Sequence, residues 1–192
     1  LSEFCPEAVI HFAGLKAVGE SVSHPRMYYD VNVGGTIALL GAMEFVGCNT
    51  IIFSSSATVY GIPNYLPFDE KHPLAPTSPY GRSKLIIEQI LKDWTNANFD
   101  RKAICLRYFN PIGAHGSGLI GECPKGVPNN LMPNMFEVAN GRLKNLPIYG
   151  NDYPTRDGTC ERDFVHVVDV ALGHAKAIEL YEALPSFEVL NL

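Results

Sequence analysis

The sequence predicts an α/β fold, a doubly wound parallel sheet with helices on both faces. Residues 8–13 and 51–53 are short apolar runs, typical of strands buried on both faces of such a sheet. A helical stretch lies between them, so this part of the chain indicates a β-α-β unit. A second helix and a third apolar run at 103–108 repeat the pattern, and this repetition favours a doubly wound sheet.

The elements of the first half follow from local sequence. Pro25 opens the first long helix, because proline suits the first helical turn, and apolar residues then recur at helical spacing until Gly47. The strand at 51–53 leads directly into Ser54, Ser55 and Ser56. Ligands bind beyond the carboxyl ends of such strands, so these serines are expected at a binding edge.

Another helix begins after a loop over 61–79 that is rich in proline and glycine. Ser78 is a suitable N-cap and Pro79 a suitable first residue, and the apolar periodicity continues to about Trp94. Tyr80 and Lys84 then lie one turn apart, where the cation favours the phenolate. Lowering a tyrosine pKa by about three units requires about 4 kcal/mol, which calls for a second cation such as a nicotinamide ring. Judged by the spacing alone, an ordinary surface pair with a half-buried ring is the more common interpretation.

From Phe109 the composition changes. Seven glycines and prolines fall within 113–128, and a loop this long in a compact domain is usually functional. We expect a helix at 131–139, strands at 147–149 and 164–168, a helix at 170–184 and a final strand at 189–192. The predicted domains are 1–110, the sheet domain, and 111–192, a smaller α+β part whose last helix and strand return to the sheet.

Composition excludes several classes. The 192 residues are 46% hydrophobic, and no apolar run is long enough to span a membrane. The net charge of −5, with scattered Lys and Arg, argues against nucleic acid. Five dispersed cysteines without Cys-x-x-Cys spacing, and histidines without metal-ligand spacing, predict no disulfide, no metal and a cytoplasmic location.

The glycines at 14 and 19, followed by Ser21, have the spacing of a phosphate-binding loop. Glu20 stands where that motif needs a lysine, and a carboxylate repels phosphate. A nucleoside triphosphatase is therefore disfavoured.

Seven segments together resemble a known family. They are 9–21, 53–61, 78–84 (Ser-Pro-Tyr-Gly-Arg-Ser-Lys), 106–111, 128–133, 149–153 and 162–167. They resemble the extended short-chain dehydrogenase/reductase family, and within it the enzymes that interconvert UDP-galactose and UDP-glucose. The resemblance covers the whole chain and implies a Rossmann-type sheet with NAD as cofactor.

The resemblance also implies roles for individual residues. Tyr80 resembles the base and acid for the 4-hydroxyl of the sugar, Lys84 the cation beside it, and Ser56 the hydroxyl that links sugar and tyrosine. The implied cofactor contacts are Phe12, Ala13, Gly14, Leu15, Lys16, Asn32, Ser56, Tyr80, Lys84 and Phe109. The implied substrate contacts are Lys16, Ser56, Ala57, Thr58, Tyr108, Phe109, Asn110, Asn129, Asn130, Leu131, Pro147, Ile148, Tyr149 and Arg162.

Some of these residues also have ordinary interpretations. Asn32 fits a helix-surface amide, and Arg162 fits a surface ion pair with Asp163. The implied activity is 4-epimerisation through transient oxidation at C4 of the sugar.

The sequence disfavours two alternative functions. A nucleotide-sugar 4,6-dehydratase typically carries an Asp-Glu pair where this chain has Ala57 and Thr58, and a catalytically inactive relative is expected to lack Tyr80 or Lys84.

The resemblance to the family also suggests a homodimer formed through the helices near 26–46 and 80–94. The family's first strand and glycine-rich turn are absent from this chain, so we expect a fragment that is inactive by itself.

Overall fold

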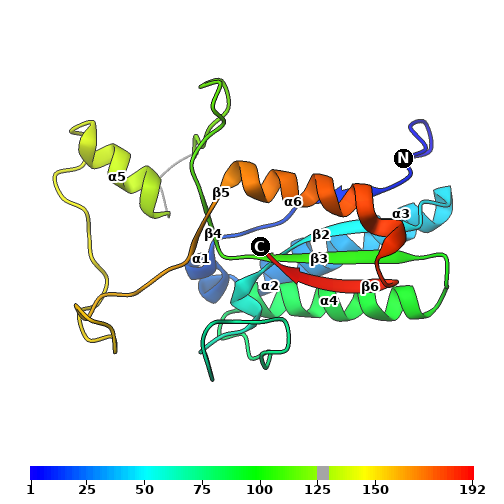
Figure 1. Ribbon diagram of the computed structural model, residues 1–192, viewed down its shortest axis with the longest axis horizontal. Helices are drawn as coiled ribbons and strands as arrows, with labels where there is room; N and C mark the ends of the chain where they lie inside the picture. The colour runs from blue at the N-terminus through cyan, green and yellow to red at the C-terminus, as the bar shows by residue number, and fades with distance from the viewer. Residues whose placement is uncertain (125–129) are drawn as a thin grey trace. The chain divides into compact units, whose positions relative to one another are not determined.

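A computed structural model of the chain describes residues 1–124 and 130–192, which divide into two compact units (Figure 1). The first unit comprises Leu1–Tyr108 and Ala171–Leu192, and the second comprises Phe109–Val170. Asn129, one of the predicted substrate contacts, lies outside the described residues.

The first unit contains a four-stranded parallel sheet in the order β1-β2-β3-β6. Its strands are β1 (Val9–His11), β2 (Thr50–Ser56), β3 (Lys102–Tyr108) and β6 (Phe187–Asn191). Phe53 in the middle of β2 pairs with His11 on one side and Cys105 on the other. The predicted parallel α/β sheet is therefore confirmed.

Helices cover both faces of this sheet, with α4 on one face and α6 on the other (Figure 1). They are α1 (Val18–Ser23), α2 (Pro25–Tyr28), the π-helical segment η1 (Tyr29–Gly34), α3 (Gly35–Val46), the 3-10 turn η2 (Ala57–Val59), α4 (Pro79–Asn96), α6 (Val167–Leu180) and the 3-10 turn η3 (Tyr181–Ala183). Successive side chains of a strand point to opposite faces. Phe53 accordingly packs with α3 and α4, while Ile52 packs with Ala177 of α6.

Two elements near the amino end differ from the prediction. β1 is shorter than the expected 8–13, and Ile10 is 41% exposed, because in the described part of the chain β1 pairs only with β2. The helix expected to begin at Pro25 contains η1, a π-helical stretch, and α1 precedes it without having been predicted. Such stretches occur frequently at functional sites.

The second unit contains β4 (Asn110–Ile112), α5 (Leu131–Ala139) and β5 (Phe164–His166), with β4 and β5 paired in parallel. β4 was missed because its segment reads as the start of a loop. The strand predicted at 147–149 is wrong. Ile148 and Tyr149 are 72% and 79% exposed and lie outside the strands, since no neighbouring strand is present in the described residues to bury them.

The predicted boundaries of the strand at 164–168 and of the helix at 170–184 also differ from those in the structure. The strand expected to reach residue 168 stops at His166, and α6 begins at Val167 and ends at Leu180 rather than running over 170–184.

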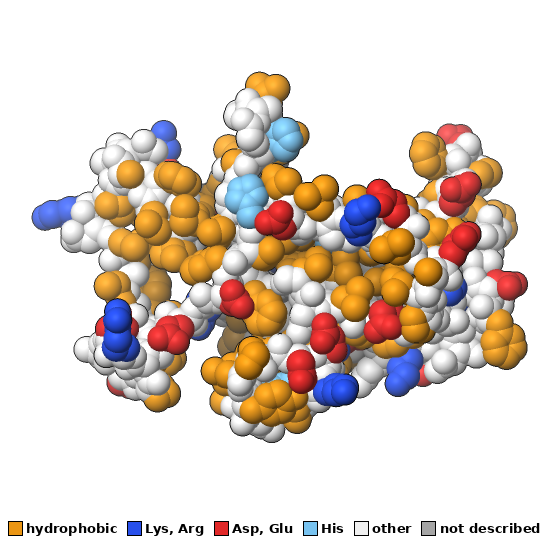
Figure 2. All heavy atoms as spheres, in the orientation of Figure 1, with side chains coloured by type: hydrophobic (Ala, Val, Ile, Leu, Met, Phe, Trp, Pro, Cys, Tyr) orange, Lys and Arg blue, Asp and Glu red, His pale blue; other side chains and the backbone are white. Residues whose placement is uncertain are grey.

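No helix among the described residues is long and apolar enough to cross a membrane. On the face drawn in Figure 2, acidic and basic side chains of the described residues are interspersed over the first unit.

Candidate active site

The amino end of α4 is fixed against the turn that follows β2. Ser78 caps the helix, because its Oγ accepts a hydrogen bond from the Gly81 amide at 3.1 Å. Gly81 also permits a close approach, since a Cβ at this position would lie 2.8 Å from the carbonyl oxygen of Thr58 in η2. The first turn of α4 therefore places Tyr80 beside the end of β2.

Ser56 is the residue of β2 that meets this tyrosine. Its buried Oγ accepts hydrogen bonds from the Thr58 amide at 3.2 Å and from Thr58 Oγ1 at 3.0 Å. The Ser56 hydroxyl also hydrogen-bonds the Tyr80 side chain. Ser56 and Tyr80, which the resemblance placed together, are thus joined at the carboxyl edge of the sheet.

Lys84 lies one helical turn after Tyr80 and is only 5% exposed. Its Nζ donates a hydrogen bond to the carbonyl oxygen of Ser54 at 2.7 Å. The same nitrogen lies 5.8 Å from the centroid of the Tyr80 ring and 4.8 Å from that of Phe53. The ammonium is therefore close to the phenol ring but is held by the backbone of β2.

Burial dominates the acid–base properties of the pair. Burial raises the pKa of Tyr80 to about 12, the nearby Tyr108 adds to this, and the hydrogen bond from Ser56 opposes it. Burial also lowers the pKa of Lys84 to about 8. Lys84 is not among the causes of the Tyr80 shift, so in the protein alone the desolvation of the phenolate dominates the pKa of Tyr80.

The predicted cofactor segment, 12–16, follows β1 and is held by one buried amide. Asn32 Oδ1 accepts from the Leu15 amide at 2.8 Å, and Asn32 Nδ2 donates to the Leu15 carbonyl at 3.0 Å and to Ser83 Oγ at 3.1 Å. A Cβ at Gly14 would lie 3.0 Å from Asn32 Oδ1. Asn32 is buried, so the surface-amide interpretation is wrong, and its side chain ties this loop to α4.

An open cavity of about 370 Å³ lies beside the same segment. Its lining is largely apolar and consists of Val9, Ile10, His11, Phe12, Ala13, Gly14, Val31, Gly35 and Leu39. Ala13 and Lys16 are exposed, and the ring of Phe12 lies 4.5 Å from the ring of His174. The loop thus borders a hollow that an apolar group can enter.

Three further predicted residues lie at the same edge of the sheet. Tyr108, at the end of β3, is opposite Ser56 in the strand register, and its hydroxyl hydrogen-bonds Ser54 Oγ. Burial raises the pKa of Tyr108. Ala57 and Thr58 form the first part of η2, and neither carries a carboxyl group.

The remaining predicted substrate residues belong to the second unit. Asn110 starts β4, and Asn130 precedes α5 and donates to Glu122 Oε1 at 3.0 Å. Arg162 is exposed and donates to the carbonyl of Glu161 at 2.7 Å, whereas an ion pair with Asp163 is not found in the part of the chain that is described. The others are Phe109, half-buried, Leu131, at the start of α5, and Pro147, Ile148 and Tyr149, all exposed.

Two buried charges near Lys84 were not predicted. Glu88, one turn after Lys84 on α4, is 3% exposed and pairs with Arg107 of β3. A carboxylate between the apolar residues Ile87 and Leu91 of the helix, and an arginine in an apolar strand, are the signals that could have revealed the pair, because buried charges are normally paired. Among the described residues no group of three or more His, Cys, Asp or Glu could hold a metal ion.

Comparison with known proteins relates this geometry to a family. The chain matches the profile of the NAD dependent epimerase/dehydratase family over residues 1–192. It is 59% identical to the UDP-glucose 4-epimerase of Bacillus subtilis (strain 168) over 173 residues, 90% of this chain and 51% of that protein. The chain spans about half the length of the curated relatives that it matches.

The chain is also similar to solved structures of UDP-glucose 4-epimerases. A UDP-glucose-4-epimerase from Stenotrophomonas maltophila, with bound NAD and formylated UDP-arabinopyranose, is 49% identical with a TM-score of 0.94, covering 100% of this chain and 57% of that one. A UDP-glucose 4-epimerase from Bifidobacterium longum, in complex with NAD+ and UDP, is 53% identical with a TM-score of 0.92, covering 97% and 56%. With a family match over its whole length and these related folds, the chain belongs to the NAD dependent epimerase/dehydratase family.

Proposed function

We propose that the complete protein interconverts UDP-galactose and UDP-glucose by NAD-dependent epimerisation at C4 of the sugar. The observation that carries this proposal is the constellation of Tyr80, Ser56 and Lys84 at the carboxyl edge of the parallel sheet. Relatives that are 54–59% identical to the chain bear the name UDP-glucose 4-epimerase, which supports the same reaction.

Tyr80 takes the proton from the 4-hydroxyl of the sugar and returns it. The hydrogen bond from Ser56 stabilises the phenolate and links the tyrosine to the sugar hydroxyl. Because burial raises the pKa of Tyr80 to about 12, the protein holds this proton firmly until a further positive charge lies nearby. Lys84 supplies one cation, and its bond to the Ser54 carbonyl orients it.

The residues of the first unit fit NAD. The loop at 12–16 borders the apolar cavity, Gly14 lets the loop pack closely on Asn32, and Asn32 fixes the loop in place. When bound, NAD accepts and returns the C4 hydride and brings the positive nicotinamide ring. Lys84 would bond the nicotinamide ribose, and Phe12, Ala13, Gly14, Leu15, Lys16 and Phe109 would complete the contacts.

The second unit supplies the substrate contacts in this proposal. Arg162 suits a diphosphate, because its guanidinium is always charged and binds two oxygens at once. Asn110, Asn129 and Asn130 would hold polar groups of the nucleotide sugar. The substrate part in this proposal lies mainly in the predicted domain 111–192, whose last helix and strand return to the sheet domain of 1–110.

Assay of the complete reading frame that encodes this chain tests the proposal. The purified protein is given UDP-galactose, and UDP-glucose is detected with a coupled dehydrogenase. Turnover that is lost in Tyr80→Phe is the expected result. Absence of turnover by the wild-type protein with NAD present, or full turnover by Tyr80→Phe, would overturn the assignment.

We further propose that the protein works as a homodimer in the cytoplasm, in galactose metabolism. The exposed faces of α3 carry large apolar side chains, among them Ile37 and Phe45, 54% and 86% exposed. Analytical ultracentrifugation of the complete protein and of Ile37→Glu is the test. A wild-type monomer, or a dimer unchanged by the substitution, argues against this interface.

A further inference from the structure

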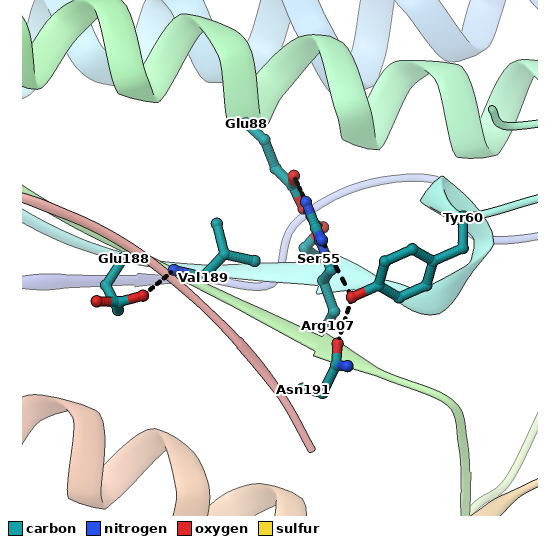
Figure 3. Close-up of polar contacts among 7 residues, drawn as sticks. All are labelled: Ser55, Tyr60, Glu88, Arg107, Glu188, Val189 and Asn191. Atoms are coloured by element: carbon teal, nitrogen blue, oxygen red, sulfur yellow. Dashed lines mark hydrogen bonds and ion pairs between the residues drawn. The ribbon is translucent and has the colours of Figure 1, made fainter. Parts of the chain in front are cut away.

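The side of α4 that faces the sheet carries a third polar residue in line with Tyr80 and Lys84. Glu88 lies one turn beyond Lys84, and its carboxylate is buried against the strands (Figure 3). Residues four apart on a helix lie on the same face. The three side chains therefore project from consecutive turns of one helix.

All hydrogen-bond donors to Glu88 that the structure records come from the sheet. Oε1 accepts from Ser55 Oγ at 2.5 Å and from Arg107 Nε at 2.9 Å, and Oε2 accepts from Arg107 Nη2 at 2.5 Å. Ser55 belongs to β2 and Arg107 to β3. The carboxylate thus binds α4 to two neighbouring strands at once.

The guanidinium of Arg107 is also held by a residue other than Glu88. Its Nη1 donates to the hydroxyl of Tyr60 at 3.1 Å, and that hydroxyl donates to Asn191 Oδ1 of β6 at 2.6 Å (Figure 3). The guanidinium also lies 4.9 Å from the centroid of the Tyr60 ring. A polar chain therefore runs from α4 across β3 to β6, and it begins one helical turn after Lys84.

The apolar packing of α4 does not fix its position along the strands in the same way. Ile87, Leu91 and Trp94 pack on Phe53 and Cys105, and such contacts are not directional. Hydrogen bonds to a planar carboxylate have preferred distances and angles. Catalytic groups need placement to within about 0.5 Å, so a directional attachment one turn from Lys84 has a functional consequence.

We propose that Glu88 is a positioning residue, whose carboxylate holds α4 on β2 and β3 and thereby sets the placement of Tyr80 and Lys84. This inference rests on the proposed epimerase function. Neither Glu88 nor Arg107 touches the reacting atoms in this assignment; each acts through α4. A misplacement of about 1 Å can lower turnover about a hundredfold.

The test uses the complete protein with NAD and compares three variants. Glu88→Gln removes the charge and one acceptor. Glu88→Leu with Arg107→Met removes both partners and leaves no buried charge unpaired. Glu44→Gln is the matched control, because Glu44 also bonds an α4 residue, accepting from Trp94 Nε1 at 2.9 Å, but at the far end of the helix.

We expect kcat to fall ten- to a hundredfold in Glu88→Gln and in the double variant, with KM for UDP-galactose within about threefold of wild type. Glu44→Gln should keep wild-type kcat. Recovery of kcat in the double variant would show that an unpaired charge, and not placement, caused the loss, and would overturn the inference. So would an equal loss in Glu44→Gln, or a wild-type kcat in Glu88→Gln.

A second readout is independent of the substrate. Amide hydrogen exchange over residues 79–84 should be faster in Glu88→Gln than in wild type and in Glu44→Gln. If the wild-type protein does not turn over UDP-galactose, the proposed function fails, and this exchange alone decides whether Glu88 positions the turn. Unchanged exchange in Glu88→Gln would overturn the positioning role.

Discussion

The ammonium of Lys84 is bound to the carbonyl oxygen of Ser54, 2.7 Å away, and not to the phenol of Tyr80, whose ring centroid lies 5.8 Å away. The backbone of β2 therefore decides where the cation sits. The group that lowers the pKa of Tyr80 is the Ser56 hydroxyl, through a side-chain hydrogen bond, and Ser56 lies two residues further along the same strand. One strand thus orients both members of the pair.

The first prediction concerns the phenol itself. Tyr80→Phe in the complete protein should lower turnover at least a thousandfold and leave NAD affinity unchanged, since a general acid–base group typically contributes about 10² to 10⁴. The coupled assay and calorimetry measure the two quantities. Tyr65→Phe is the control, because the Tyr65 hydroxyl bonds Asp69 in an exposed loop. Near-normal turnover in Tyr80→Phe would remove Tyr80 from the mechanism.

The second prediction follows from the pKa of Lys84, which burial lowers from 10.5 to about 8. Below pH 8 the lysine is charged in both states, and burying that charge destabilises the fold by about 3 kcal/mol. Between pH 8 and 10.5 the unfolded state binds more protons than the folded state, so the free energy of unfolding rises with pH.

Lys84→Met removes this dependence. The free energy of unfolding of Lys84→Met minus that of wild type should be about 2 kcal/mol smaller at pH 9.5 than at pH 7. The lost bond to Ser54 affects both pH values equally. Urea unfolding at the two pH values measures the difference. If variant and wild type differed in unfolding free energy by the same amount at both pH values, Lys84 would have its ordinary pKa.

A third prediction concerns the loop that Asn32 holds. Asn32→Ala should weaken NAD binding about tenfold and lower the free energy of unfolding by about 1–3 kcal/mol, because the Leu15 backbone loses two part-buried hydrogen bonds to this side chain. Asn98→Ala, at an exposed turn, is the control. Calorimetric titration with NAD is the measurement, and an unchanged dissociation constant would separate Asn32 from cofactor binding.

The fourth prediction uses two glycines in helices. Gly81→Ala should destabilise the protein by about 1–3 kcal/mol and lower kcat, since the new Cβ would lie 2.8 Å from the Thr58 carbonyl and push α4 from η2. Gly41→Ala, with open space around it on α3, should instead raise stability by about 1 kcal/mol. Thermal unfolding compares them, and equal effects of both substitutions would contradict the close approach.

Much of the first unit could be predicted from the sequence because its signals are local. The Ser78-Pro79 start fixed one helix boundary, and the apolar runs located β2 and β3 to within a few residues. The apolar pair at 148–149 misled the prediction, since a strand also needs a neighbour to pair with, which a local pattern does not report. β4 was missed for the converse reason: its partner β5 lies more than fifty residues away.

The acid–base behaviour of the site could be predicted only in part. The helical spacing placed Lys84 near Tyr80, but the extent of burial, which raises the pKa of the tyrosine, depends on the packing of the whole unit. The pairing of Glu88 with Arg107 likewise joins segments that only the fold brings together. Spacing along one helix is local information, whereas desolvation is a property of the assembled core.

Strand β2 is buried along its whole length, yet its chemistry changes midway, from Ile51, Ile52 and Phe53 to three serines. Its first half provides cohesion, and its second half provides hydrogen-bonding groups to Lys84, Glu88 and Tyr80 in turn. A designer of variants therefore has two separate regions to change on one strand. Substitutions before residue 54 would lower the melting temperature alone, whereas substitutions of the buried serines would lower it and would also displace the side chains at the site.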